Sequence, residues 1–170
     1  MPVHLILGGA RSGKSGYAEE LALTSPDPLH YVATATAGDG EMSERIDRHR
    51  RHRSERFTTH ECPLALATEL NRLDQPGATV LVDCLTLWLT NALLAPDDTT
   101  WPREREALLD SLDSLQANCL LISNEVGHGV VPMDALSRRF VDEAGLLHQA
   151  IARQADRVTL VVAGLPQALK

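Results

Sequence analysis

The chain has 170 residues, which suffices for one α/β domain with a sizeable core and is too short for two, so we expect a single domain over residues 1–170. The formal net charge of −7 argues against a nucleic-acid partner, because general nucleic-acid-binding proteins are normally basic. No apolar run approaches the ~18 residues of a membrane span and no signal peptide precedes the first predicted strand, so we expect a cytoplasmic protein.

Strand-like and helix-like segments alternate along the chain. Apolar, β-rich runs predict strands over residues 3–7, 29–34, 79–83, 120–123 and 158–163. Helical patterns predict helices over residues 14–23, 40–57, 63–73, 85–94, 102–117 and 134–155. This alternation implies a mostly parallel sheet that helices cover on both faces. We therefore predict an α/β fold with a single doubly wound, mostly parallel sheet.

The most specific motif follows the first predicted strand. It has the form G-x-x-x-x-G-K-[ST] and consists of Gly8, Gly9, Ala10, Arg11, Ser12, Gly13, Lys14 and Ser15. A strand before the glycines and a helix after them are the context in which this motif binds a polyphosphate. Backbone N–H groups then face the phosphates, Lys14 reaches the β- and γ-phosphates, and the Ser15 hydroxyl can ligate Mg²⁺. The motif favours a nucleoside triphosphate site over a simple glycine turn, with Lys14 ending at a water-accessible helix start.

Polar residues also close two other predicted strands. In a doubly wound sheet, ligands bind beyond the carboxyl ends of the strands. Asp83 ends an apolar run, where an acidic residue commonly holds Mg²⁺, although such a carboxylate can also be a turn or helix-capping residue. Asn124 and Glu125 end another strand, and the sequence leaves open whether they orient substrate or satisfy loop backbone groups.

A run of basic residues lies in the helix predicted over residues 40–57. Helical spacing puts one stripe through Met42, Ile46, His49, Arg53 and Phe57. His49 and Arg53 are thus expected on the face that carries apolar residues. A neutral imidazole can attack phosphorus and a guanidinium can balance the developing charge. A structural histidine satisfies the same pattern, so periodicity leaves the role of His49 open.

Four stretches, standing in one order, resemble a known family. They are the loop at 8–15, the run Tyr31–Ala35, Glu41-Met42 with Arg45-Ile46-x-x-His49, and Asn124-Glu-Val-Gly-x-Gly-x-Val-Pro132. From about residue 3 to the tail at 161–166, the chain resembles the bifunctional adenosylcobinamide kinases and adenosylcobinamide-phosphate guanylyltransferases of cobalamin biosynthesis. This resemblance implies a P-loop NTPase fold of the RecA-like type and assembly as a homotrimer.

The resemblance also implies a reaction sequence. Such an enzyme phosphorylates the aminopropanol hydroxyl of adenosylcobinamide with ATP or GTP, and then transfers GMP from GTP to the new phosphate through a guanylylated histidine. His49 matches that histidine. The matching nucleotide contacts are the loop residues together with Ala33, Thr34, Ala35, Arg50, Arg51, His52, Arg53, Glu61 and Asp83. The expected cofactors are GTP, ATP and Mg²⁺, with Ser15 and Asp83 near the metal, and the expected partner is the corrinoid.

Two alternatives belong to other classes of function. In the first, the protein is a small-molecule kinase only, and His49 is structural. In the second, it is a nucleotide-regulated binding protein that uses the arginine-rich segment as a partner surface. Labelling of the protein by α-labelled GTP distinguishes the bifunctional enzyme from both.

Overall fold

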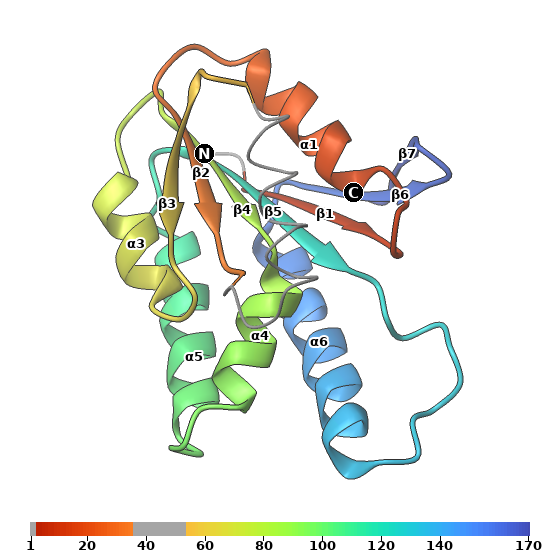
Figure 1. The fold of residues 1–170 in the computed structure, drawn as a ribbon. Coiled ribbons are helices and arrows are strands. Elements are labelled where there is room, and N and C mark those ends of the chain that lie inside the picture. Colours follow the sequence, from red (N-terminus) through yellow and green to blue (C-terminus); the bar gives the residue numbers. More distant parts are fainter. Residues whose placement is uncertain (1–2, 36–53) are drawn as a thin grey trace.

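Residues 3–35 and 54–170 are described in the computed structural model of the chain, which Figure 1 shows as a ribbon. They include seven strands, which are β1 (Val3–Gly8), β2 (Leu29–Ala33), β3 (Phe57–Glu61), β4 (Thr79–Asp83), β5 (Asn118–Asn124), β6 (Arg157–Val162) and β7 (Leu165–Ala168). All seven form one sheet in the order β3-β2-β4-β5-β1-β6-β7. Neighbouring strands run parallel, except that β7 runs antiparallel to β6. The predicted α/β fold with a mostly parallel sheet is confirmed.

Helices lie on both faces of this sheet (Figure 1). The described helices are α1 (Lys14–Leu23), α3 (Leu66–Leu73), α4 (Leu85–Leu93), α5 (Thr100–Leu112) and α6 (Ala135–Gln154). None of those in residues 3–35 and 54–170 has both the length and the apolar character that a bilayer crossing requires. The sheet is therefore doubly wound, as the alternation of strands and helices predicted.

The two faces of the sheet bury two separate apolar clusters. On one face, Ala18 and Ala22 of α1 pack against alternate residues of the strands. On the other face, α3, α4, α5 and α6 supply a larger cluster that includes Trp88 and Leu108. All six residues of β1 are buried, because its side chains alternate between the two clusters. The central position of β1 holds the segment that follows it at a fixed place on the sheet edge.

The helix predicted over residues 40–57 is wrong at its carboxyl end. Glu55 and Arg56 form a turn, and Phe57 begins β3, where it pairs with Leu29. Phe57 is buried against Tyr31 of the neighbouring strand, with ring centroids 5.9 Å apart. Phe57 therefore cannot be the last member of a helical stripe. Residues 36–53, which hold the other members of that stripe, lie outside the described part of the chain.

The remaining differences concern edge strands and element ends. No strand was expected beyond residue 163, yet Leu165–Ala168 pairs with β6 as β7. Helix α3 begins at Leu66 and not at residue 63, because its first turn is replaced by a bend after Cys62. Helix α5 spans Thr100–Leu112 in place of the predicted 102–117.

Candidate functional site

The carboxyl ends of the parallel strands lie along one edge of the sheet. Gly8 pairs with Asn124, Asp83 pairs with Ile122, and Ala33 pairs with Asp83. These registers place the ends of β1, β2, β4 and β5 within two residues of the same level. The strand-end residues that the sequence suggested for ligand binding are thus brought to a common edge.

The loop of residues 8–15 joins β1 to α1 at this edge. Gly13 is the N-cap of α1 and has φ 94°, a left-handed conformation that glycine adopts without steric cost. The Nζ atom of Lys14 donates a hydrogen bond to the carbonyl oxygen of Gly9 at 3.0 Å, so the lysine folds back over its own loop. The first N–H groups of α1 have no partner within the helix and are available to an anion at its amino end. This is the backbone geometry of a phosphate cradle.

Close packing makes the first glycine of the loop irreplaceable. A Cβ atom on Gly8 would lie 2.3 Å from Oγ of Ser12 and 2.8 Å from the carbonyl oxygen of Val161. The Ser12 hydroxyl is buried and has no hydrogen-bond partner among the described residues. A hydroxyl left unsatisfied inside the loop is consistent with a loop built to receive acceptor atoms of a ligand.

The turn between β6 and β7 supports the same loop. The N–H of Gly164 donates a hydrogen bond to the carbonyl oxygen of Ser12 at 2.7 Å. A Cβ on Gly13 would lie 3.1 Å from the Cα of Gly164, so the two backbones are in direct contact. Sequence reasoning missed this contact because β7 was not expected. The sequence signal was Gly164 directly after the predicted strand; in the structure Ala163 and Gly164 both have positive φ, as in a tight hairpin turn.

Lys14 is buried at the edge of the sheet that also carries Asp83. Lys14 is only 8% exposed, which contradicts the expected water-accessible helix start. Burial lowers the pKa of Lys14, and the negative charge of Asp83 opposes that shift. Oδ2 of Asp83 accepts a hydrogen bond from the Tyr31 hydroxyl at 2.7 Å. The N-cap of the following helix is Cys84 and not Asp83, which weighs against the capping alternative.

Ser15 and Asp83 fit a magnesium ion that is also held by phosphate. Residues 3–35 and 54–170 contain no group of three or more His, Cys, Asp or Glu side chains that could hold a metal by itself. Mg²⁺ does not need such a group, because it is commonly bound by one or two protein oxygens, waters and substrate phosphates. A hydroxyl in the first turn of α1 and a carboxylate at the end of β4 are oxygen ligands of that kind.

The other suggested nucleotide contacts occupy different positions along the edge. Thr34 is fully buried, and its hydroxyl donates to the carbonyl oxygen of Cys84 at 2.7 Å and accepts from the Cys84 N–H at 2.9 Å. Its side chain therefore joins β2 to the start of α4. Ala33 and Ala35 are half-buried beside it. Glu61 ends the outermost strand, four strands from β1, which is about 19 Å at the usual strand spacing.

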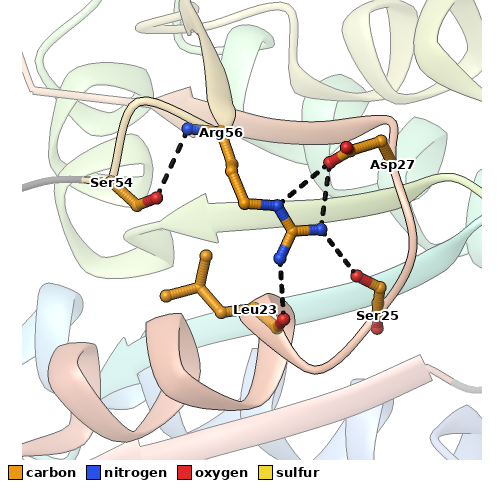
Figure 2. A network of polar contacts seen from close by, with 5 residues as sticks. All are labelled: Leu23, Ser25, Asp27, Ser54 and Arg56. Atoms are coloured by element: carbon orange, nitrogen blue, oxygen red, sulfur yellow. Dashed lines mark hydrogen bonds and ion pairs between the residues drawn. The ribbon is translucent and has the colours of Figure 1, made fainter.

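Arg56 binds segments at the amino ends of β2 and β3, away from the strand ends that carry the phosphate loop (Figure 2). Its guanidinium donates hydrogen bonds to the carbonyl oxygens of Leu23 and Ser25, both at 2.9 Å, and to Oδ1 of Asp27 at 3.0 Å. Arg56 immediately precedes β3, so these bonds tie the amino end of β3 to the segment between α1 and β2. This arginine belongs to the basic run but stabilises the fold away from the phosphate loop.

Asn124 and Glu125 bond to groups of the protein itself. Nδ2 of Asn124 donates to Oγ1 of Thr86 at 3.1 Å, and Oε1 of Glu125 accepts from the Gly127 N–H at 2.6 Å. The second alternative, in which these residues satisfy loop groups, therefore has direct support for Glu125. The suggested catalytic His49 and the contacts Arg50, Arg51, His52 and Arg53 lie outside the described residues.

Comparison with known proteins gives consistent likenesses over almost the whole chain. A family model described as cobinamide kinase / cobinamide phosphate guanyltransferase matches residues 4–169. The bifunctional adenosylcobalamin biosynthesis protein CobP of Pseudomonas aeruginosa is 58% identical over 166 residues, covering 98% of this chain and 96% of the relative. The bifunctional adenosylcobalamin biosynthesis protein CobU of Salmonella typhimurium is 37% identical over 179 residues, covering 98% of each chain.

Solved structures resemble the fold at low sequence identity. The ATPase domain of G40P has a TM-score of 0.51 at 15% identity, and the match covers 94% of this chain and 68% of that domain. A prototypical ATPase from the type III secretion system of pathogenic bacteria has a TM-score of 0.56 at 12% identity, covering 98% of this chain and 56% of that one. These likenesses confirm the predicted P-loop NTPase fold.

Proposed function

The chain belongs to the cobinamide kinase / cobinamide phosphate guanyltransferase family, and from this premise we propose the two reactions that it catalyses and the residues that carry them. One domain, residues 1–170, phosphorylates the aminopropanol hydroxyl of adenosylcobinamide with ATP or GTP and then transfers GMP from GTP to the product. The observation that carries the proposal is the complete phosphate loop between β1 and α1, with Asp83 at the carboxyl end of β4 on the same edge of the sheet.

In the kinase reaction, the loop binds the triphosphate and the acceptor supplies the nucleophile. The acceptor hydroxyl oxygen attacks the γ-phosphorus, the bond to the β-phosphate oxygen breaks, and the hydroxyl proton passes to water. Lys14 and the backbone N–H groups at the start of α1 balance the charge on the phosphates as the nucleoside diphosphate leaves. Ser15 and Asp83 would hold Mg²⁺, which supplies further charge neutralisation when it is bound.

In the guanylyl transfer, His49 is the nucleophile. Its neutral imidazole attacks the α-phosphorus of GTP, pyrophosphate leaves, and a phosphoramidate forms on the ring nitrogen. A phosphate oxygen of adenosylcobinamide phosphate then displaces the imidazole and receives the GMP group. Two steps through a histidine replace one difficult transfer between two anions. Positive charge close to His49 in sequence, at Arg50, Arg51 and Arg53, disfavours the imidazolium form and attracts the triphosphate.

The remaining parts of the proposal concern nucleotide contacts and assembly. Ala33, Ala35 and Glu61 are proposed to contact the nucleotide, Thr34 to position their segment, and His52 to lie beside the guanine nucleotide. The protein is proposed to work in the cytoplasm as a homotrimer. Size-exclusion chromatography with light scattering measures the subunit number directly.

The decisive experiment is covalent labelling with GTP. We expect label from α-labelled GTP, and none from γ-labelled GTP, to remain on the protein after denaturing electrophoresis. A phosphoramidate is stable in alkali and labile in acid, so acid treatment should remove the label. The absence of any α-label on an active kinase would show that the protein is a small-molecule kinase only.

Substitutions identify the labelled residue. His49→Asn should lose the label and the guanylyl transfer while it still phosphorylates cobinamide, because the kinase step needs no histidine adduct. His52→Asn is the control, three positions further along the same basic run, and should still be labelled at saturating GTP, because His52 is proposed to contact the nucleotide and not to form the adduct. Label that persists in His49→Asn and disappears in His52→Asn would reassign the nucleophile.

A further inference from the structure

A chain of polar contacts joins Ser123, Glu125 and His148 where β5 ends and α6 packs near it. Nε2 of His148, in α6, lies 2.7 Å from Oγ of Ser123, which is fully buried near the end of β5. Nδ1 of the same ring lies 4.0 Å from Oε2 of Glu125. The other carboxylate oxygen, Oε1, accepts the hydrogen bond from the Gly127 N–H. One imidazole therefore links a helix on the sheet face to the segment that leaves β5.

The surroundings of His148 favour the neutral form of its imidazole. His148 is only 7% exposed, and burial lowers its pKa, an effect that the negative charge of Glu125 opposes without reversing. A neutral imidazole has one donor and one acceptor nitrogen. If Nδ1 carries the proton and faces the Glu125 carboxylate, Nε2 accepts the proton of the Ser123 hydroxyl, so the hydroxyl is satisfied and the ring N–H is directed toward a negative charge 4.0 Å away.

The segment held by this chain adjoins the phosphate loop. The N–H of Glu125 donates to the carbonyl oxygen of Gly8 at 3.0 Å, which continues the pairing of β5 with β1 into the loop. On its other side β5 pairs with β4, which ends at Asp83. Residues 124–127 thus leave the sheet between the phosphate-binding loop and the carboxylate suggested for the metal. Given the proposed roles of Lys14 and Asp83, the terminal phosphoryl group would lie beside this segment.

Gly127 completes this arrangement. A Cβ at this position would lie 3.0 Å from Oε1 of Glu125, closer than a side chain normally approaches. The carboxylate therefore packs directly on the backbone whose N–H group it binds. A shift of the Glu125 side chain would move this backbone, because contact and hydrogen bond act on the same peptide group.

We propose that His148 is a positioning residue for the kinase reaction, acting through Ser123 and Glu125 to hold residues 124–127 at the acceptor side of the phosphate site. This inference rests on the proposed kinase activity and assigns a role to residues to which the proposed function gives none. It requires that the effect of His148 on phosphoryl transfer depend on Glu125.

The test compares His148→Leu with His148→Gln in the full-length protein. Leucine has no polar atom for Ser123, whereas the glutamine amide can reach the place of Nε2. We expect His148→Leu to lower kcat for cobinamide phosphorylation about tenfold with an unchanged KM for ATP, because a small misplacement of the acceptor slows transfer without weakening nucleotide binding. His148→Gln should recover most of that loss. Formation of the α-GTP adduct, which needs no acceptor, should be unchanged in both.

A second comparison separates positioning from stability. His4 is a matched control, because its Nε2 lies 2.8 Å from Oγ1 of Thr159 in an equally buried pair near the other end of β1. His4→Leu should lower the melting temperature as His148→Leu does, with no change in kcat. In a double-mutant cycle, Glu125→Gln should slow the kinase, and His148→Leu should have little further effect on kcat.

Each contrary result identifies what has failed. An active wild-type kinase in which His148→Leu keeps full kcat, or loses it only in proportion to the folded fraction, overturns the positioning role alone. Independent, additive effects of His148→Leu and Glu125→Gln on kcat also overturn it. A folded wild-type protein that phosphorylates no cobinamide overturns the proposed function, and the positioning role with it.

Discussion

The hydroxyl of Tyr31 donates a hydrogen bond to Oδ2 of Asp83 at 2.7 Å, linking neighbouring strands β2 and β4 at the phosphate edge. Tyr31 is only 2% exposed, so its ring is fixed by packing and its polar end is directed to the carboxylate. The protein therefore orients Asp83 through a buried residue. A carboxylate held this way presents its charge without first losing side-chain freedom.

This relationship predicts how activity depends on magnesium. Asp83→Asn keeps the shape of the side chain but removes its charge, so we expect the Mg²⁺ concentration for half-maximal kinase activity to rise. Tyr31→Phe leaves the charge and removes only the orienting hydrogen bond. It should therefore raise the same Mg²⁺ concentration by less than Asp83→Asn does, about tenfold. Titration of activity with Mg²⁺ measures both. An unchanged Mg²⁺ dependence in Asp83→Asn would show that this carboxylate is not linked to the metal.

Substitution of Lys14 should separate phosphate binding from packing. Lys14→Met retains most of the buried aliphatic volume and lacks the ammonium, whereas Lys14→Ala also leaves a gap beside the loop. We expect both variants to lose at least about 100-fold in kinase kcat, because the charge that balances the phosphates is gone. Thermal unfolding should show a lower melting temperature for Lys14→Ala than for Lys14→Met. Near-normal kinase activity in a folded Lys14→Met protein would contradict the role given to this lysine.

Two glycines near the start of α1 should respond in opposite ways to alanine. Gly13 has positive φ and contacts Gly164, so Gly13→Ala should destabilise the protein by about 1–3 kcal/mol. Gly16 lies inside α1 with open space around the added Cβ, so Gly16→Ala should stabilise it by about 0.5–1 kcal/mol. Denaturant unfolding measures both free energies. Equal effects of the two substitutions would mean that the loop does not need a left-handed residue at position 13.

Stability should fall in mildly acidic solution because of buried histidines. Burial lowers the pKa of His4 and of His148 below the ordinary value of 6.5. The imidazoles of the unfolded chain then bind protons at a higher pH than those of the folded protein. The contribution of these two histidines to the free energy of unfolding is therefore fully present above about pH 6.5 and is lost as the pH falls toward the folded pKa values. Unfolding free energies measured from pH 8 to pH 5 should show this slope. His4→Asn and His148→Asn should each flatten it, and an unaltered slope in the double variant would assign it to other groups.

The sequence predicts the buried strands of this fold better than its edges. Strands β1, β4 and β5 are continuous apolar runs because both faces of each strand are covered, and their positions were correctly predicted. Strand β3 is an edge strand in which only Phe57 is buried, so Thr58 and Thr59 gave no alternation that could compete with the helical pattern before them. Strand β7 is exposed throughout and contains a proline, which is tolerated only at a sheet edge.

The candidate site divides in the same way between local and long-range signals. The loop at 8–15 was predictable because its function depends on consecutive residues. The contacts of Thr34 with Cys84 and of His148 with Ser123 join residues far apart in sequence, and no spacing pattern encodes them. The burial of Lys14 was missed for the same reason, since the turn at Gly164, far away in sequence, packs against the loop at the start of α1. Phe57, the last residue of the proposed helical stripe, lies in β3, so the role of His49 stays a prediction.

The fluorescence of the two tryptophans of the chain should report on the packing of the helices on one face of the sheet. Trp88 in α4 and Trp101 in α5 lie with ring centroids 5.4 Å apart at an interplanar angle of 69°, and both are buried. Their indole N–H groups donate to the carbonyl oxygen of Leu64, just before α3, and to Oε2 of Glu143 in α6, so the pair contacts elements on either side of α4 and α5. Intrinsic fluorescence therefore follows the packing of the face opposite α1, and a change at the phosphate loop alone should leave the emission spectrum unaltered.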